Sequence, residues 1–146
     1  MQAKQRKCIL SNCSVSELVC GVDIVEIERF ARVLEVGGKR FLHRVYTESE
    51  LTFCADRLPQ LAVRFAAKEA ISKALGTGIQ GIHWGEMEII SDQHGCPFVS
   101  LYGRAAARAE QMRIVTWAVS LSHSPHFAIA FVVASRMKRP DTESSP

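Results

Sequence analysis

The segment RFAAKEAISKALGTGIQG, residues 64–81, joins two kinds of sequence. Its alanine-rich first part predicts a helix, which we expect over residues 61–75 because Pro59 breaks the chain just before it. Its second part contains three glycines within six positions, namely Gly76, Gly78 and Gly81. The segment is therefore either a core helix with a flexible exit or the floor of a site that holds an anion.

A helical wheel places two charged residues of this helix among apolar ones. At about 100° per residue, one stripe consists of Ala62, Ala66, Ala70 and Ala74. Glu69 and Lys73 fall beside this stripe, in the arc of Phe65, and apolar residues occupy almost the whole circumference, as in a helix packed on more than one side. An exposed ion pair between residues four apart is one interpretation of Glu69 and Lys73. A ligand site is the other, because a carboxylate among small apolar neighbours costs free energy unless it is paired or binds a metal.

The glycines that follow the helix suit a phosphate, although the pattern is weak on its own. Glycines such as Gly76 and Gly78 let backbone N–H groups approach an anion closely. Glycine-rich exits are also common helix C-caps, and the segment matches neither a Walker loop nor a Rossmann fingerprint. Three basic residues favour the anion site: Arg64, Lys68 and Lys73.

Asp23 is a second acid in an apolar context, CGVDIVEI at residues 20–27. One interpretation is a solvent-facing Asp at the end of a strand. The other pairs Asp23 with Glu69 as two oxygen ligands of Mg²⁺, which takes one or two carboxylates and completes its shell with water and substrate phosphates. Two acids with basic residues and glycines indicate phosphate-transfer chemistry rather than a serine or cysteine hydrolase.

Ser122, His123 and Ser124 are three adjacent hydrogen-bonding residues between two strand-like segments. A lone histidine after a strand is often structural. Three such groups at a hairpin tip also suit contact with an anion or a nucleotide.

The other segments predict an α+β fold. We expect strands at residues 18–25, 86–92, 97–102, 116–123 and 126–135, and further helices at 26–36, 47–51 and 103–112. Gly37 and Gly38 should end the first helix, and Thr47 with Glu50 forms a capping box that opens the second. The order β-α-α-α-β-β-α-β-β favours a single domain with a mostly antiparallel sheet packed against helices. We expect this domain at 19–135, after a loose extension (1–18) and before a flexible tail (136–146).

Composition limits the class of protein. The 146 residues are 47% hydrophobic and 23% charged, as in a globular protein, and no apolar run is long enough to span a membrane. The net charge of +3 fits an anionic ligand or an acidic partner better than nucleic acid. The five cysteines include no C-x-x-C pair, so we expect free thiols and a cytoplasmic protein rather than a zinc site.

The sequence resembles a known family over about residues 20–134. GVDIVEIERF (21–30), RFAAKEAISKALGTGI (64–79) and WAVSLSHSPHFAIAFVV (117–133) occur in the order seen in holo-acyl-carrier-protein synthases, the small bacterial 4′-phosphopantetheinyl transferases. The resemblance implies transfer of 4′-phosphopantetheine from coenzyme A to a serine of apo-acyl carrier protein, as in fatty acid biosynthesis. Adenosine 3′,5′-bisphosphate is released, and the usual form is a homotrimer with active sites between protomers.

The resemblance also implies roles for individual residues. Asp23 and Glu69 correspond to the ligands of Mg²⁺, and Arg29 to a basic residue that meets the acidic carrier. Lys73 and Glu69 are the catalytic residues that it implies, and Glu69 acting through a water is one hypothesis for the group that accepts the proton of the carrier's serine. Contacts to coenzyme A are implied for Arg64, Lys73, Gly76, Gly78, Pro97, Ser122, His123 and Ser124.

The chain departs from the family pattern at a few positions. Cys96 stands where a basic residue is usual, so we expect one cation fewer near the nucleotide. Two alternative functions remain open at this point. One is the same chemistry on carrier domains of polyketide or peptide synthases, and the other is a carrier- or nucleotide-binding module without catalysis.

Overall fold

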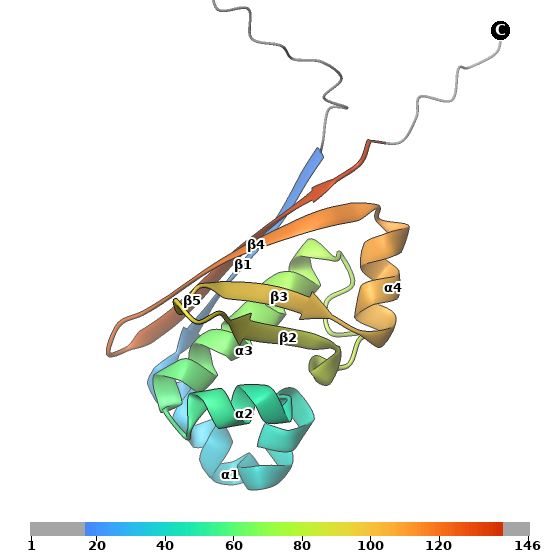
Figure 1. Ribbon diagram of the computed structural model, residues 1–146. Helices are drawn as coiled ribbons and strands as arrows, with labels where there is room; N and C mark the ends of the chain where they lie inside the picture. The colour runs from blue at the N-terminus through green and yellow to red at the C-terminus, as the bar shows by residue number, and fades with distance from the viewer. Residues whose placement is uncertain (1–16, 139–146) are drawn as a thin grey trace, which may run out of the picture.

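A computed structural model describes residues 17–138 of the chain, so most of the predicted N-terminal extension (1–18) and most of the predicted tail (136–146) lie outside this range. The predicted bounds are wrong where they can be compared, because Glu17 and Leu18 belong to the first strand and Arg136 ends the last one. The described part forms one α+β domain with two antiparallel sheets, which confirms the predicted fold class (Figure 1). The larger sheet has the strand order β1 (Glu17–Glu26), β5 (Phe127–Arg136), β4 (Ile114–His123). A smaller sheet pairs β2 (Met87–Ser91) with β3 (Pro97–Leu101).

Helix α3 (Leu58–Ala74) is the central helix and contacts both sheets (Figure 1). Its alanines are buried against the larger sheet, where β5 contributes Ala128, Ala130, Val132 and Ala134 to the core. The helix begins three residues before the predicted start. Pro59 lies in its first turn instead of breaking the chain, because the N–H group that proline lacks would have no helical partner there.

The remaining helices lie on different sides of α3. They are α1 (Ile27–Val45), α2 (Glu48–Cys54), α4 (Gly103–Gln111) and the short 3-10 helix η1 (Trp84–Glu86). Helices α1 and α2 pack on α3, and Arg108 of α4 is bonded to Leu75 at the C-terminal end of α3. The predicted end of α1 at Gly37 and Gly38 is a kink, since Gly38 has a φ of 52° and the chain then resumes a helical course to Val45. The capping box of Thr47 and Glu50 at the start of α2 is confirmed.

The larger sheet lies unusually close to α3 at one residue of β1. A Cβ atom on Gly21 would overlap the carbonyl oxygen of Ala70. A glycine in the interior of a strand can mark such a close approach of two backbones. Asp23 lies two residues further along the same face of β1, so it is brought against α3.

Two further observations concern residues 17–138. Cys20, Cys54 and Cys96 are free thiols. None of the helices in this range has both the length and the apolar character needed to cross a membrane.

Candidate active site

Asp23 and Lys73 form an ion pair between β1 and α3. The Lys73 Nζ atom lies 2.8 Å from Asp23 Oδ1 and 2.9 Å from the carbonyl oxygen of Val22. Lys73 thus pairs across the β1–α3 contact and not with Glu69 one turn earlier, so the interpretation as a simple i,i+4 ion pair is wrong. The Asp23 side chain is 19% exposed and the Lys73 side chain 50% exposed, so this pair faces solvent on one side.

Glu69 lies in the same cavity as Asp23. The cavity has a volume of about 690 Å³, and its walls include Asp23, Arg29, Phe65 and Glu69. Burial raises the pKa of Glu69, the negative charge of Asp23 raises it further, and Lys73 partly opposes both. No described side chain or backbone N–H group donates a hydrogen bond to its carboxylate. Positive charge that enters this cavity would therefore be stabilised.

The donor set of this cavity fits Mg²⁺. Residues 17–138 contain no group of three or more His, Cys, Asp or Glu side chains that could hold a metal ion. Magnesium does not need such a cage, because it keeps several waters and takes one or two carboxylates together with substrate phosphates. Asp23 and Glu69 are two carboxylates of this kind. Burial and then the negative charge of Asp23 raise the pKa of Glu69, and a cation between the two carboxylates would oppose both effects.

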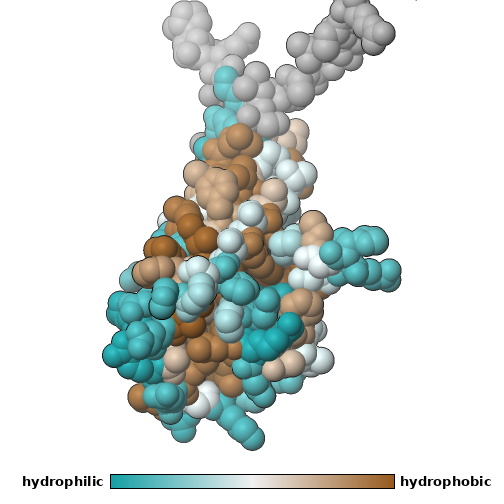
Figure 2. All heavy atoms as spheres, turned by 90° about the vertical axis from the view of Figure 1, so that its left-hand side faces the viewer, coloured by the Kyte–Doolittle hydropathy of each residue, from teal (hydrophilic) through white to brown (hydrophobic). Residues whose placement is uncertain are grey.

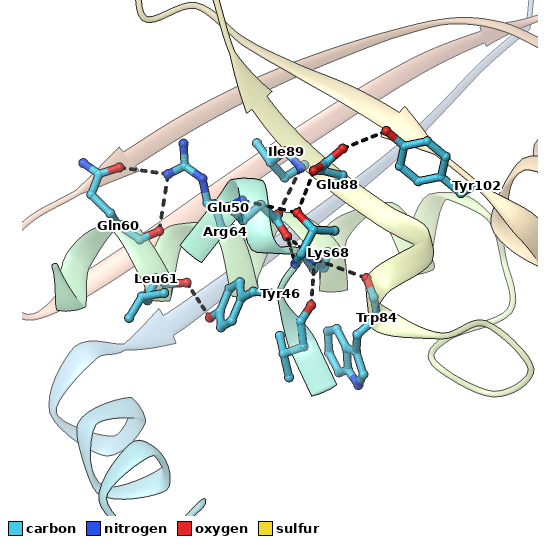
Figure 3. A network of polar contacts seen from close by, with 12 residues as sticks. Tyr46, Glu50, Gln60, Leu61, Arg64, Lys68, Trp84, Glu88, Ile89 and Tyr102 are labelled. Atoms are coloured by element: carbon cyan, nitrogen blue, oxygen red, sulfur yellow. Dashed lines mark hydrogen bonds and ion pairs between the residues drawn. The ribbon is translucent and has the colours of Figure 1, made fainter. Parts of the chain in front are cut away.

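A second cavity, of about 380 Å³, contains four of the residues that the sequence assigns to coenzyme A. They are Arg64, Pro97, Ser122 and His123. Arg64 is 1% exposed, and its guanidinium lies 4.3 Å from the centre of the Phe53 ring. It donates to Gln60 Oε1 at 2.9 Å (Figure 3). It also donates to Ser91 Oγ at 3.2 Å, while its Nε atom has no hydrogen-bond partner.

Among the ion pairs of the described residues, none involves Arg64. A buried cation is costly unless it is paired. An anion in this second cavity would supply the missing partner, so the geometry is that of an anion site.

Other predicted site residues lie apart from both cavities. Gly76 and Gly78 adopt positive φ angles of 69° and 56° in the loop after α3, but neither is part of either cavity wall. The Ser124 hydroxyl is engaged in the β4–β5 turn, where it accepts hydrogen bonds from the N–H groups of His126 and Phe127. The expectation that Lys68 adds to an anion site is wrong, because its ammonium group is fully buried in an ion pair with Glu50.

Comparisons with known proteins identify the family of this chain. The family model described as the 4′-phosphopantetheinyl transferase superfamily matches residues 19–132. The chain belongs to the 4′-phosphopantetheinyl transferase superfamily. It is therefore an enzyme of this transferase type, and the resemblance seen in the sequence is confirmed.

Individual phosphopantetheinyl transferases match almost over their full length. The holo-[acyl-carrier-protein] synthase of Herpetosiphon aurantiacus is 47% identical over 123 residues, which cover 80% of this chain and 97% of the relative. That of Dehalococcoides mccartyi is 48% identical over 117 residues, with 80% and 98% coverage.

Solved structures of the same family share the fold. The synthase of Helicobacter pylori in complex with coenzyme A superposes with a TM-score of 0.73 at 33% identity, covering 79% of this chain and 98% of that one. The synthase of Neisseria meningitidis gives a TM-score of 0.72 at 36% identity, with 80% and 96% coverage.

Two important residues of this transferase were missed by the sequence reasoning. Gly21 sets the approach of β1 to α3, and an isolated glycine within a strand pattern was the available signal. Glu50 was interpreted only as a capping residue, although its carboxylate also accepts a hydrogen bond from Lys68, eighteen positions away. No local pattern signals a contact over that separation.

Proposed function

We propose that this transferase moves 4′-phosphopantetheine from coenzyme A to a serine of an apo-acyl carrier protein and releases adenosine 3′,5′-bisphosphate. The observation that carries the proposal is the position of Asp23 and Glu69 in the wall of one cavity, with Lys73 bound to Asp23. The names of the relatives and the coenzyme A complex of the Helicobacter pylori protein support the choice of substrates.

Asp23 and Glu69 would hold Mg²⁺ in this cavity. Bound Mg²⁺ supplies neutralisation of the charge that moves onto the leaving phosphate when the pyrophosphate is cleaved. Lys73 adds a cation beside Asp23 and is exposed enough to reach a phosphate oxygen. Glu69 would also accept the proton of the carrier's serine through a water molecule. Its carboxylate is available for this role because it accepts no hydrogen bond from the described residues.

The second cavity is our site for the nucleotide end of coenzyme A. The unpaired guanidinium of Arg64 suits a phosphate, and Ser122 and His123 add hydrogen-bonding groups beside it. We also propose that the backbone groups of Gly76, Gly78 and Ser124 contact coenzyme A outside this cavity. None of these three residues lines either cavity within a single chain.

We propose that the two cavities meet through a second copy of the chain. They share no wall residue, and the outer face of the larger sheet extends from Ile24, in the first cavity, through Ile129 to Ser122, in the second. This face carries exposed apolar side chains, among them Val22 at 49%, Ile24 at 61% and Phe131 at 45%. Figure 2 shows apolar atoms gathered over the sheet-bearing part of one side of the molecule. A homotrimer that buries this face and places the Arg64 cavity of one protomer beside the Glu69 cavity of the next completes our proposal.

The carrier would dock on α1. Arg29 lies between the Glu69 cavity and an apolar groove of about 650 Å³ formed by Arg29, Arg32, Val33, Val36, Gly37 and Phe41. Carrier proteins are acidic, so the two arginines would attract and orient them. A carrier bound in this groove would present its serine next to Glu69.

A mass measurement tests the transfer. The protein is incubated with coenzyme A, Mg²⁺ and apo-acyl carrier protein, and the carrier is then weighed by mass spectrometry. We expect a gain of one phosphopantetheine group that EDTA abolishes. An unchanged carrier mass, with carrier binding retained, would instead indicate a binding module.

A mixing experiment tests the shared site. Asp23→Asn and Arg64→Ala each damage a different cavity, so each variant alone should be nearly inactive. If sites form between protomers, mixed oligomers contain some sites with both cavities intact, and co-refolding should restore part of the activity. The absence of any restoration in mixed trimers verified by light scattering would place both cavities of a site in one chain.

A further inference from the structure

A second lysine–carboxylate pair lies inside the fold, one residue from Glu69. The Lys68 Nζ atom is 2.6 Å from Glu50 Oε2, and the two side chains are 0% and 1% exposed (Figure 3). The same Nζ atom donates to the carbonyl oxygens of Val45 at 2.7 Å and Trp84 at 3.2 Å. All three protons of the ammonium group are thus directed at acceptors.

The Glu50 carboxylate extends this network to other elements. Its Oε1 atom accepts a hydrogen bond from the N–H group of Ile89 at 3.0 Å, and its Oε2 atom accepts one from the N–H group of Thr47 at 2.9 Å. The end of α1, the start of α2, η1 and β2 are therefore all tied to α3 at Lys68. The network has no solvent-facing opening at either charge.

Stability alone does not account for such a pair. Replacing a buried ion pair by apolar residues of similar volume is often neutral or stabilising. The pair instead fixes the orientation of α3, because each of its hydrogen bonds holds this helix relative to one neighbouring element.

The network reaches the Glu69 cavity by two routes. Along the chain, Lys68 directly precedes Glu69, so the rotation of α3 that satisfies Lys68 also sets where Glu69 lies. Across space, the carbonyl group of Trp84 is held by Lys68, and the Trp84 ring stacks on Phe65 with 4.9 Å between ring centres. Phe65 is itself part of the cavity wall with Asp23 and Glu69.

We propose that Lys68 and Glu50 are positioning residues of the transferase, which fix the rotation of α3 and the Phe65 wall so that Glu69 faces Asp23 at the right separation for a divalent cation. This inference rests on the proposed function of that cavity. It assigns no contact with substrate to either residue.

The test compares Glu50→Gln with Ile71→Val. The Glu50 variant keeps the size of the side chain but weakens its bond to Lys68, whereas Ile71 is a fully buried apolar residue of the same helix with no polar contact. Both variants should melt at lower temperature than the parent. The readout is the affinity for Mn²⁺ in the presence of coenzyme A, measured from the electron paramagnetic resonance signal of free Mn²⁺ well below the melting transitions.

We expect Mn²⁺ to bind ~10-fold more weakly to Glu50→Gln, since groups that orient metal ligands typically contribute 10- to 100-fold. kcat should fall by a similar factor while KM for coenzyme A stays within ~3-fold, because Arg64 and its cavity are not altered. Ile71→Val should leave the Mn²⁺ affinity unchanged. If Glu50→Gln does not fold, Glu50→Asp, which keeps the charge and shortens the side chain, gives the same comparison.

Equal Mn²⁺ affinity in both variants would overturn the positioning role and leave the network purely structural. Failure of the parent protein to bind Mn²⁺ or to transfer phosphopantetheine is a separate result, which would overturn the proposed function itself.

Discussion

Helix α3 carries two lysine–carboxylate pairs that differ in burial and in surroundings. Lys68 and Glu50 are excluded from solvent, and every proton of the ammonium group has an acceptor. Lys73 and Asp23 are partly exposed, and the Glu69 carboxylate beside them accepts no hydrogen bond from residues 17–138. The Lys68–Glu50 pair has no free hydrogen-bonding group for a ligand, whereas the Glu69 carboxylate beside Lys73 and Asp23 can still accept one. Hydrogen-bond satisfaction, and not residue type, thus separates the structural charge pair from the one that we propose to be functional.

Removing the buried lysine is expected to have the largest effect. Lys68→Met leaves the Glu50 carboxylate buried without its cation, which should lower the free energy of unfolding by about 3–5 kcal/mol. Denaturant unfolding followed by circular dichroism measures this change. A loss of less than about 1 kcal/mol, as for an exposed pair, would remove the distinction between the two pairs.

Removing the exposed lysine should give the opposite pattern. Lys73→Ala should reduce kcat by roughly 10²–10³-fold, as expected when a group that stabilises developing charge is lost. The free energy of unfolding of this variant should change by less than about 1 kcal/mol, because the Lys73 side chain is half-exposed and its pair with Asp23 faces solvent on one side. Turnover and unfolding are measured on the same preparation, and normal turnover would contradict the role assigned to Lys73.

Widening the contact between β1 and α3 should sharpen the comparison. In Gly21→Ala the added methyl group would overlap the carbonyl oxygen of Ala70, so the strand must move away from the helix, at a cost of about 1–3 kcal/mol. Asp23 moves with the strand, so the Mg²⁺ concentration for half-maximal activity should rise. Gly85→Ala is the matched control, because nothing lies within 4 Å of a Cβ atom at that position. An unchanged Mg²⁺ requirement in Gly21→Ala would show that Asp23 is held independently of this contact.

The smallest expected effect is on the carrier. Arg29→Glu reverses a charge between the α1 groove and the Glu69 cavity. We expect KM for the acyl carrier protein to rise ~10-fold, mainly through slower association at low salt, with KM for coenzyme A nearly unchanged. Steady-state kinetics at two salt concentrations measure both constants. An equal loss for both substrates would place Arg29 outside the carrier surface.

The sequence by itself determined the order of elements, the α+β class and the acids of the site. Apolar periodicity and glycine positions are local properties, so the strands and helices followed from them. The predicted helix boundaries differ from the structure at the start of α3 and at the kink of α1. At both places a proline or a glycine lies within a helix that it was expected to end. The family resemblance assigned site roles to Asp23, Glu69 and Lys73, and the fold brings these three residues close together.

Only the tertiary structure decided which charges are free to act. Lys68 and Lys73 are both lysines of one alanine-rich helix, and no local pattern distinguishes them. Long-range packing buries Lys68 against Glu50 and leaves Lys73 at the edge of β1, because Gly21 permits that strand to approach. The division of the predicted site between two cavities is equally non-local, since it depends on which residues of β1, β4 and α3 become neighbours when the sheet packs on the helix.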